Sequence, residues 1–208
     1  MTKEHGRLLF CFCGPTASGK SSICRKIVES VKDAELSVST TTRPIRPGEK
    51  KGRDYFFVTQ EEFAARVQSG SFVEYAQYNG NFYGTEYRNI DAASATNVDL
   101  LLDIEVQGVQ QLKKRYGDRV IVVFVIPPSL AELEKRLRDR ATETEEVIQS
   151  RLLIASQEIA ILSKNNFSDY LLVNESLEES ILLGASFVRA EQSKVSRNIP
   201  RIKTIISS

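Results

Sequence analysis

A glycine-rich stretch near the start of the chain contains the residue types that bind phosphate groups. Residues 14–21 match the pattern G-x-x-x-x-G-K-[ST]. In this pattern the backbone N–H groups surround a phosphate chain, the lysine reaches the outer phosphates and the final hydroxyl ligates magnesium. We therefore predict that Lys20 and Ser21 bind a nucleotide and Mg²⁺; the alternative, a glycine turn without a ligand, leaves Lys20 unexplained. The predicted phosphate-binding residues are Gly14, Pro15, Thr16, Ala17, Ser18, Gly19, Lys20, Ser21 and Ser22.

Two carboxylates end a predicted buried strand further along the chain. Asp103 and Glu105 are two residues apart, so their side chains share one face of that strand. Parallel sheets bind ligands at the ends of their strands, and an acid there can hold magnesium through water and offset a basic phosphate site. We predict the magnesium role for Asp103. The alternative for either carboxylate is to cap the helix that follows.

Three arginines form another candidate group. Arg136 and Arg140 lie four residues apart on one predicted helix and therefore point the same way, and Arg151 lies on the next helix. Arginines on a mobile lid can neutralise the charge of a transferring phosphoryl group and exclude water from it. The alternative is an ordinary solvated helix face.

These side chains need a scaffold, and hydrophobic patterning predicts it. Residues 8–13 form a continuous apolar segment suited to a buried strand, and residues 22–31 read as the helix that follows. Apolar strands then alternate with helices that open with capping boxes, which predicts a mostly parallel, doubly wound sheet. The other predicted strands are 36–42, 54–58, 72–78, 97–105, 119–126 and 170–174, and the other predicted helices are 59–68, 106–116, one that begins at 129, 142–164 and 176–192.

The same patterning divides the chain into parts. We expect an α/β fold with a P-loop NTPase-type parallel sheet flanked by helices, an inserted mixed α/β lobe for the second substrate, and a helical lid. The lobe contains a loop, residues 43–53, that is punctuated by Pro and Gly and carries five cations and one acid. The expected parts are the core (7–36, 97–128 and 165–192), the lobe (37–88), the lid (about 129–164) and a basic, unpatterned tail (193–208).

Composition argues against several other classes of protein. A length of 208 residues suits one domain, and a net charge of +1 provides no general attraction for nucleic acid or acidic lipid. We find neither an apolar run that could span a bilayer nor a secretory signal, so we expect a cytoplasmic protein without nucleic-acid or membrane partners. Three cysteines argue against a disulfide framework, and for Cys11 and Cys13 core packing competes with a metal site. His5 is the single histidine, so a His-based zinc site or a Ser-His-Asp triad is not expected.

Three further segments resemble the signature motifs of the guanylate kinases, in that family's order and spacing. They read STTTRPIRPGE followed by G-x-D-Y-x-F within residues 39–57, F-x-E-Y-A-x-Y-x-G-x-x-Y-G-T at residues 72–85, and D-I-E-V-Q-G at residues 103–108. The similarity covers about residues 7–189. It implies an enzyme of purine nucleotide metabolism and GMP recycling that transfers the γ-phosphoryl group of Mg·ATP to GMP, and also to dGMP. It leaves open whether the protein is a monomer or a homodimer.

The resemblance also implies which residues bind GMP. Four of them match the residues that hold the GMP phosphate, and two guanidinium groups with two phenols suit a dianion; the alternative is a solvated, arginine-rich loop. Glu74 matches the acceptor of the guanine N1–H and exocyclic amine, and Thr85 matches a hydroxyl that reads the base. Adenine lacks both donors, so a buried Glu74 would discriminate against it. The implied phosphate residues are Arg43, Arg46, Tyr55 and Tyr83, with Ser39 nearby.

The remaining roles follow from the same resemblance. Glu105, with Asp103 on the same strand, matches an acid near the acceptor nucleotide and the metal, and Asn174 falls where the family contacts the adenine of the donor. The catalytic cations that the resemblance implies are Lys20, Arg46, Arg136, Arg140 and Arg151.

The chain departs from the family pattern at three positions. Ala17 stands where these kinases commonly carry glycine, and a left-handed backbone there would cost roughly 1 kcal/mol. Thr85 and Glu105 replace a serine and an aspartate of many relatives but keep the functional group, so we expect modest consequences.

Two other functions are compatible with parts of the sequence. The glycine-rich loop also resembles that of tRNA dimethylallyltransferases, but balanced charge offers no RNA surface and that hypothesis leaves Glu74 and Tyr83 unexplained. A catalytically inactive, guanylate-kinase-like interaction module would bind phosphopeptides. Such modules typically lack a working phosphate loop, whereas Lys20, Ser21 and the lid arginines are all present here.

Overall fold

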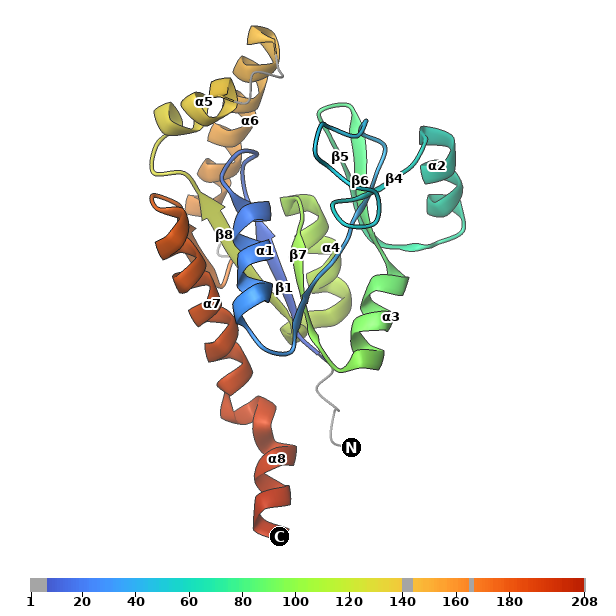
Figure 1. The fold of residues 1–208 in the computed structure, drawn as a ribbon, viewed down its shortest axis with the longest axis vertical. Helices are drawn as coiled ribbons and strands as arrows, with labels where there is room; N and C mark the ends of the chain where they lie inside the picture. Colours follow the sequence, from blue (N-terminus) through green and yellow to red (C-terminus); the bar gives the residue numbers. More distant parts are fainter. Residues whose placement is uncertain (1–6, 140–143, 165–166, 208) are drawn as a thin grey trace.

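The core is a five-stranded parallel sheet with strand order β2-β7-β1-β8-β9. The computed structural model describes residues 7–139, 144–164 and 167–207 (Figure 1). Every residue of β1 is buried, which explains why this strand reads as a continuous apolar run rather than an alternating one. The predicted parallel sheet is confirmed. Its strands are β1 (Leu9–Cys13), β2 (Ala34–Leu36), β7 (Asp99–Asp103), β8 (Val120–Ile126) and β9 (Tyr170–Val173).

Helices cover both faces of this sheet (Figure 1). The sheet therefore separates the hydrophobic core into two halves. Successive side chains of β1 point to opposite faces, so Phe10 and Phe12 pack with Ile23 and Ile27 of α1 on one side. Leu9, Cys11 and Cys13 pack on the other side, among residues of α3 and α4. The helices on the first face are α1 (Lys20–Ser30) and α7 (Leu177–Ser193), and those on the second are α3 (Tyr87–Thr96) and α4 (Val106–Tyr116).

The lobe is a second, four-stranded mixed sheet with strand order β4-β3-β6-β5. Its one long hairpin turns at Asn79 and Gly80, which both have positive φ, as a tight turn requires. The predicted capping box is confirmed, because Thr59 and Glu62 bond reciprocally at the start of α2. The elements are β3 (Thr40–Thr41), β4 (Phe56–Phe57), α2 (Gln60–Gln68), β5 (Phe72–Tyr78) and β6 (Asn81–Glu86).

The segment expected as the lid is a pair of helices. It lies at the ends of the core strands, on the side opposite the lobe (Figure 1). α5 (Leu130–Asp139) begins where the Ser129 hydroxyl accepts from the Glu132 N–H at 3.0 Å, as predicted. α6 (Glu145–Lys164) packs against it around Leu133 and Leu137. Arg140 and the predicted cap at Thr142 lie outside the described residues.

Three expectations about the elements were wrong. The segment expected as one strand, 36–42, instead contains only the last residue of β2 of the core and, after a break, β3 of the lobe. The helix α3 was not predicted, and the tail expected to be unpatterned forms α8 (Val195–Ser207). Its isoleucines recur at helical spacing, but Pro200 within the segment obscured that pattern. Among the described residues, no helix is both long and apolar enough to cross a membrane.

Candidate functional site

The phosphate loop lies between β1 and α1, and its carbonyl groups accept hydrogen bonds from the lysine at its end. Lys20 Nζ donates to the carbonyl oxygens of Gly14 at 2.6 Å and Pro15 at 2.9 Å. Gly14 and Gly19 have φ values of +124° and +100°, which side chains rarely adopt. The loop is therefore shaped with its lysine ammonium buried beneath it, where a phosphate chain could replace the two carbonyls as partners.

Asn174 supports this loop from behind. Its side-chain amide donates to the Ser18 carbonyl at 2.7 Å and accepts from the Ser180 hydroxyl at 3.0 Å. A Cβ at Gly19 would clash with this amide, so glycine is required there for packing as well as for its backbone conformation. Asn174 is buried and does not line the pocket of the described structure. Its side-chain amide is therefore bonded to the phosphate loop and to α7.

Ala17 adopts the left-handed conformation on which the expected strain depended, with φ of +60°. Its methyl group packs in the small hydrophobic cluster of the lid, with Leu133, Leu137 and Ile148. Burial of this methyl group offsets part of the roughly 1 kcal/mol that the backbone conformation costs. The alanine thereby joins the phosphate loop directly to the lid.

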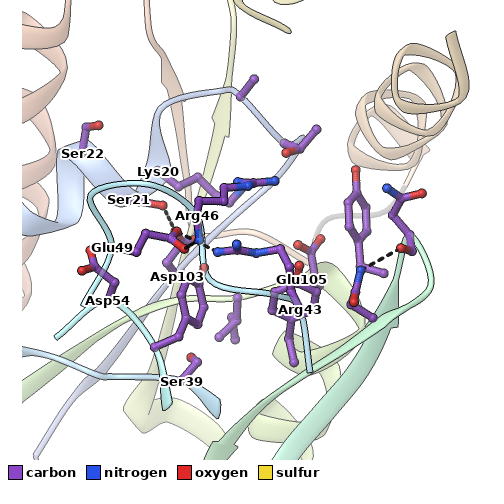
Figure 2. A pocket seen from close by; sticks show the side chains of 18 of the residues that line it. Lys20, Ser21, Ser22, Ser39, Arg43, Arg46, Glu49, Asp54, Asp103 and Glu105 are labelled. Atoms are coloured by element: carbon purple, nitrogen blue, oxygen red, sulfur yellow. Dashed lines mark hydrogen bonds and ion pairs between the residues drawn. The ribbon is translucent and has the colours of Figure 1, made fainter. Parts of the chain in front are cut away.

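Oxygen ligands for a hard cation gather at the end of β7. The Ser21 hydroxyl donates to the carboxylate of Asp103, and both residues line the pocket (Figure 2). Burial raises the pKa of Glu105 to about 7, with the Lys20 ammonium opposing the shift and Glu158, Asp103 and Glu74 adding to it. A hydroxyl next to a carboxylate suits Mg²⁺, which keeps several of its waters and takes few protein ligands.

The described residues contain no group of three or more His, Cys, Asp and Glu side chains that could hold a metal by themselves. Cys11, Cys13 and Cys24 are free and buried, and burial raises the pKa of each thiol. They pack in the two halves of the core, as the core-packing interpretation predicts.

The arginine-rich loop of the lobe forms a cationic clamp in which one acid, Glu49, pairs with Arg43. The Arg43 guanidinium donates to Glu49 at 2.7 Å, and the Arg46 N–H donates to the other oxygen of the same carboxylate at 2.8 Å. Burial opposes both charges, yet their pairing raises the pKa of Arg43 and lowers the pKa of Glu49. The Arg43 guanidinium lies 5.4 Å from the ring centroid of Tyr55, whose ring is 6.1 Å from that of Tyr83.

The clamp and the phosphate loop open into one cavity. It has a volume of about 480 Å³, and Figure 2 shows Lys20, Arg46, Asp103 and Glu105 converging on it from core and lobe. Of the residues predicted from the sequence, those that line it are Thr16, Ala17, Gly19, Lys20, Ser21, Ser22, Ser39, Arg43, Arg46, Tyr55, Glu74, Tyr83, Asp103, Glu105 and Arg151. Those that do not are Gly14, Pro15, Ser18, Thr85, Arg136 and Asn174.

Glu74 and Thr85 form a buried polar pair at the inner end of the lobe. Glu74 is 3% exposed, and one carboxylate oxygen accepts from the Thr85 N–H at 2.8 Å. Burial raises the pKa of Glu74 to about 7, against the effect of that hydrogen bond. The Thr85 hydroxyl is fully buried and makes no hydrogen bond within the described residues. Glu74 lines the cavity and Thr85, which does not, holds its carboxylate from behind.

The two described lid arginines are placed differently. Arg151 is buried, lines the cavity and donates to the Thr16 hydroxyl at 3.1 Å. Arg136 donates to Glu132 at 2.9 Å and to the Asn174 carbonyl at 2.9 Å, outside the cavity. Arg151 therefore contacts the phosphate loop, whereas Arg136 holds the segment behind it.

Several charged residues of the site were not predicted from the sequence. Glu49 was counted as one acid in a basic loop, although its position three residues after Arg46 and six after Arg43 could have identified it as their partner. Glu158 on α6 lies near Lys20 and Glu105, and burial raises its pKa against the effect of Lys20. Arg25 and Asp54 also line the cavity, and no spacing rule connects residues so far apart in sequence.

Comparison with known proteins agrees with the geometry. The family model described as guanylate kinase matches residues 7–191. The chain is 45% identical to a guanylate kinase of Syntrophotalea carbinolica and 41% identical to one of Thermotoga maritima, over 94% of this chain in both cases and over 90% and 92% of those proteins. The crystal structure of guanylate kinase from Anaplasma phagocytophilum is similar with a TM-score of 0.76 and 33% identity, covering 97% of this chain and 95% of the other.

Proposed function

The chain belongs to the guanylate kinase family, whose general activity is phosphoryl transfer from ATP to GMP, and on that premise we propose how its pocket performs the transfer. It is a nucleoside monophosphate kinase. One observation carries the assignment of its sites: a single cavity joins a phosphate loop to a second cationic clamp and a buried carboxylate. Such a cavity suits two anionic substrates that meet end to end.

The phosphate loop holds the donor. Its backbone N–H groups and Lys20 bind the outer phosphates of ATP, and the ammonium exchanges the carbonyls of Gly14 and Pro15 for phosphate oxygens. Ser21, with Asp103 through water, would hold Mg²⁺, which when bound neutralises charge on the phosphates. Asn174 keeps the loop in shape through Ser18, and we assign it this supporting role in place of the adenine contact that the family resemblance implies.

The clamp holds the acceptor. Arg43, Arg46, Tyr55 and Tyr83, with Ser39 beside them, bind the phosphate of GMP, which displaces Glu49 as the partner of Arg43. Phosphoryl transfer to GMP needs no general base, because the attacking phosphate monoester is already anionic at neutral pH.

Glu74 and Thr85 read the base. An ionised Glu74 accepts from the N1–H and the 2-amino group of guanine. The Thr85 N–H holds the Glu74 carboxylate, and we assign its hydroxyl to the base from the family resemblance. Adenine would leave these buried atoms unpaired, which is the physical origin of strong discrimination. The 2′-hydroxyl of the ribose has no part in this recognition, so dGMP is expected to be accepted.

The lid completes the site. Arg151 already reaches the phosphate loop at Thr16, so its guanidinium is positioned to stabilise charge on the transferring group. Arg136, which bonds Asn174 in this structure, would have to change partners to take the same role when the lid closes. Arg140 is proposed for the same task from its spacing alone.

The experiment is a measurement of ADP release from Mg·ATP with GMP, dGMP, AMP, CMP and UMP offered separately. We expect turnover with the two guanine nucleotides only. In parallel, Glu74→Gln is expected to lose its preference for GMP over AMP, because its amide places a donor against the guanine donors. Binding of GMP without turnover would instead support the interaction-module hypothesis.

For the cellular compartment we propose the cytoplasm, since three free buried thiols suit a reducing environment.

A further inference from the structure

An ion pair joins the helix of the phosphate loop to the loop of the acceptor clamp. Arg25 of α1 donates to one carboxylate oxygen of Asp54, which immediately precedes the clamp residue Tyr55. Arg25 lies one turn beyond Ser21 on the same side of α1, so this side of the helix carries both a donor-site hydroxyl and the guanidinium. The four residues Ser21, Arg25, Asp54 and Asp103 also line a small hollow between core and lobe.

Asp54 uses its second oxygen to organise the acceptor loop. That oxygen accepts from the Lys50 N–H at 2.8 Å and from the Arg53 Nε at 2.9 Å. Burial would raise the pKa of Asp54, but these bonds and the charges of Arg25 and Arg53 lower it, so the carboxylate is ionised throughout the neutral range. One oxygen therefore shapes the loop while the other connects it to the core.

The two partners differ in exposure, which separates their roles. The Asp54 side chain is 2% exposed, and that of Arg25 is 45% exposed. Removing the Arg25 guanidinium leaves Asp54 with two other donors, so the loop keeps its own hydrogen bonds and loses only its connection to α1. Substitution of Asp54, in contrast, would disturb both.

We propose that Arg25 is a positioning residue for phosphoryl transfer. Through Asp54 it fixes the acceptor clamp relative to the phosphate loop, and so sets the separation of the two phosphates that react. In-line transfer is sensitive to displacements of about 1 Å, and the two sites belong to different sheets. This inference rests on the proposed function, because it assumes that the clamp holds the acceptor.

The decisive variant is Arg25→Met, which keeps an unbranched side chain and removes the charge. A connection between core and lobe predicts that kcat/KM for GMP falls about fivefold, while the Kd of Mg·ATP without acceptor stays within about twofold. Arg25→Lys is expected to recover most of the loss, because lysine can still donate to Asp54. The matched control is Lys26→Met, since Lys26 pairs with Glu29 on α1 at 2.7 Å and does not line the cavity.

A second measurement does not depend on turnover. Without substrates, amide hydrogen exchange in residues 50–55 is expected to be at least about fivefold faster in Arg25→Met than in the wild type or in Lys26→Met. The proposal is overturned if exchange is unchanged, if kcat/KM for GMP stays within twofold, or if Arg25→Lys recovers nothing. If the wild type fails to phosphorylate GMP, the proposed function fails, whereas the exchange experiment still decides whether Arg25 holds the loop.

Discussion

Gly108 of α4 lies so close to the carboxylate of Glu74 that a side chain at position 108 would occupy the space of Glu74 Oε2. The two residues belong to different parts of the molecule, since Glu74 is in β5 of the lobe and Gly108 is in the core. The glycine of the D-I-E-V-Q-G motif thus makes room for the residue to which we assign base recognition.

Gly108→Ala is therefore expected to displace Glu74. Overpacking of this kind costs about 1–3 kcal/mol, and the displaced carboxylate would lose its bond to Thr85. We expect KM for GMP to rise by about tenfold or more and the preference for GMP over AMP to fall. Steady-state kinetics with both nucleotides test this. Gln110→Ala, at an exposed position of the same helix, is the control and should leave both parameters unchanged; wild-type kinetics in Gly108→Ala would contradict the assignment.

Buried carboxylates are expected to make stability and GMP binding depend on pH in opposite directions. Burial raises the pKa of Glu74 and Glu105 from 4.5 to about 7. The folded protein therefore binds more protons than the unfolded chain between these values, and the free energy of unfolding falls as pH rises from about 5 to 8. Glu49 and Asp54 have lowered pKa values, so the stability that their ionised forms contribute to the fold is lost only in more acidic solution.

GMP affinity should instead increase across the same range, because only the ionised Glu74 accepts two hydrogen bonds from guanine. Thermal denaturation of the free protein and calorimetric titration with GMP at pH 6, 7 and 8 measure both trends. In Glu74→Gln the slope of each should become smaller. A GMP affinity that is independent of pH in the wild type would show that Glu74 does not bind the base.

Lys20→Ala is expected to separate turnover from acceptor binding. Among the described residues, both hydrogen bonds of the ammonium go to carbonyls of the phosphate loop, so its loss should act on the donor site and lower kcat by about 100-fold or more. The Kd of GMP should stay within about twofold, as measured by titration in the absence of ATP. Lys26→Ala on the same helix controls for loss of charge. An equal loss of GMP affinity would mean that the two phosphate sites have been assigned incorrectly.

Asn174→Ala is expected to loosen the phosphate loop. Removing the amide leaves the Ser18 carbonyl and the Ser180 hydroxyl buried without this partner, at a cost of about 2 kcal/mol. For a chain of this size that lowers Tm by roughly 4–8 °C, and the Kd of Mg·ATP should rise. Asn198→Ala, which removes an amide from the start of α8, should leave ATP binding unaffected. Unchanged ATP affinity in Asn174→Ala would restrict Asn174 to a role in stability.

Long elements with a strong period were predictable from local chemistry. β5 and α4 have the expected bounds. They are seven and eleven residues long, which is enough for the spacing of apolar residues on their buried faces to show in the sequence. Short elements were not. β2 and β3 have three and two residues, too few for a period, and α3 begins at Tyr87 after Glu86, whose side chain does not cap the helix.

Residue type and spacing were enough to identify the phosphate loop, because it is a short segment with local geometry. The resemblance to family motifs, and not spacing alone, indicated the residues of the lobe that line the cavity. The contacts that hold the site together could not be read in the same way. Arg25 meets Asp54, and Asn174 meets Ser18, across 29 and 156 residues of chain. Many other cations and amides have the same local sequence signals. The approach of the lobe to α1 selects Asp54 for Arg25, and the strand order β1-β8-β9 of the core sheet brings Asn174 to the phosphate loop.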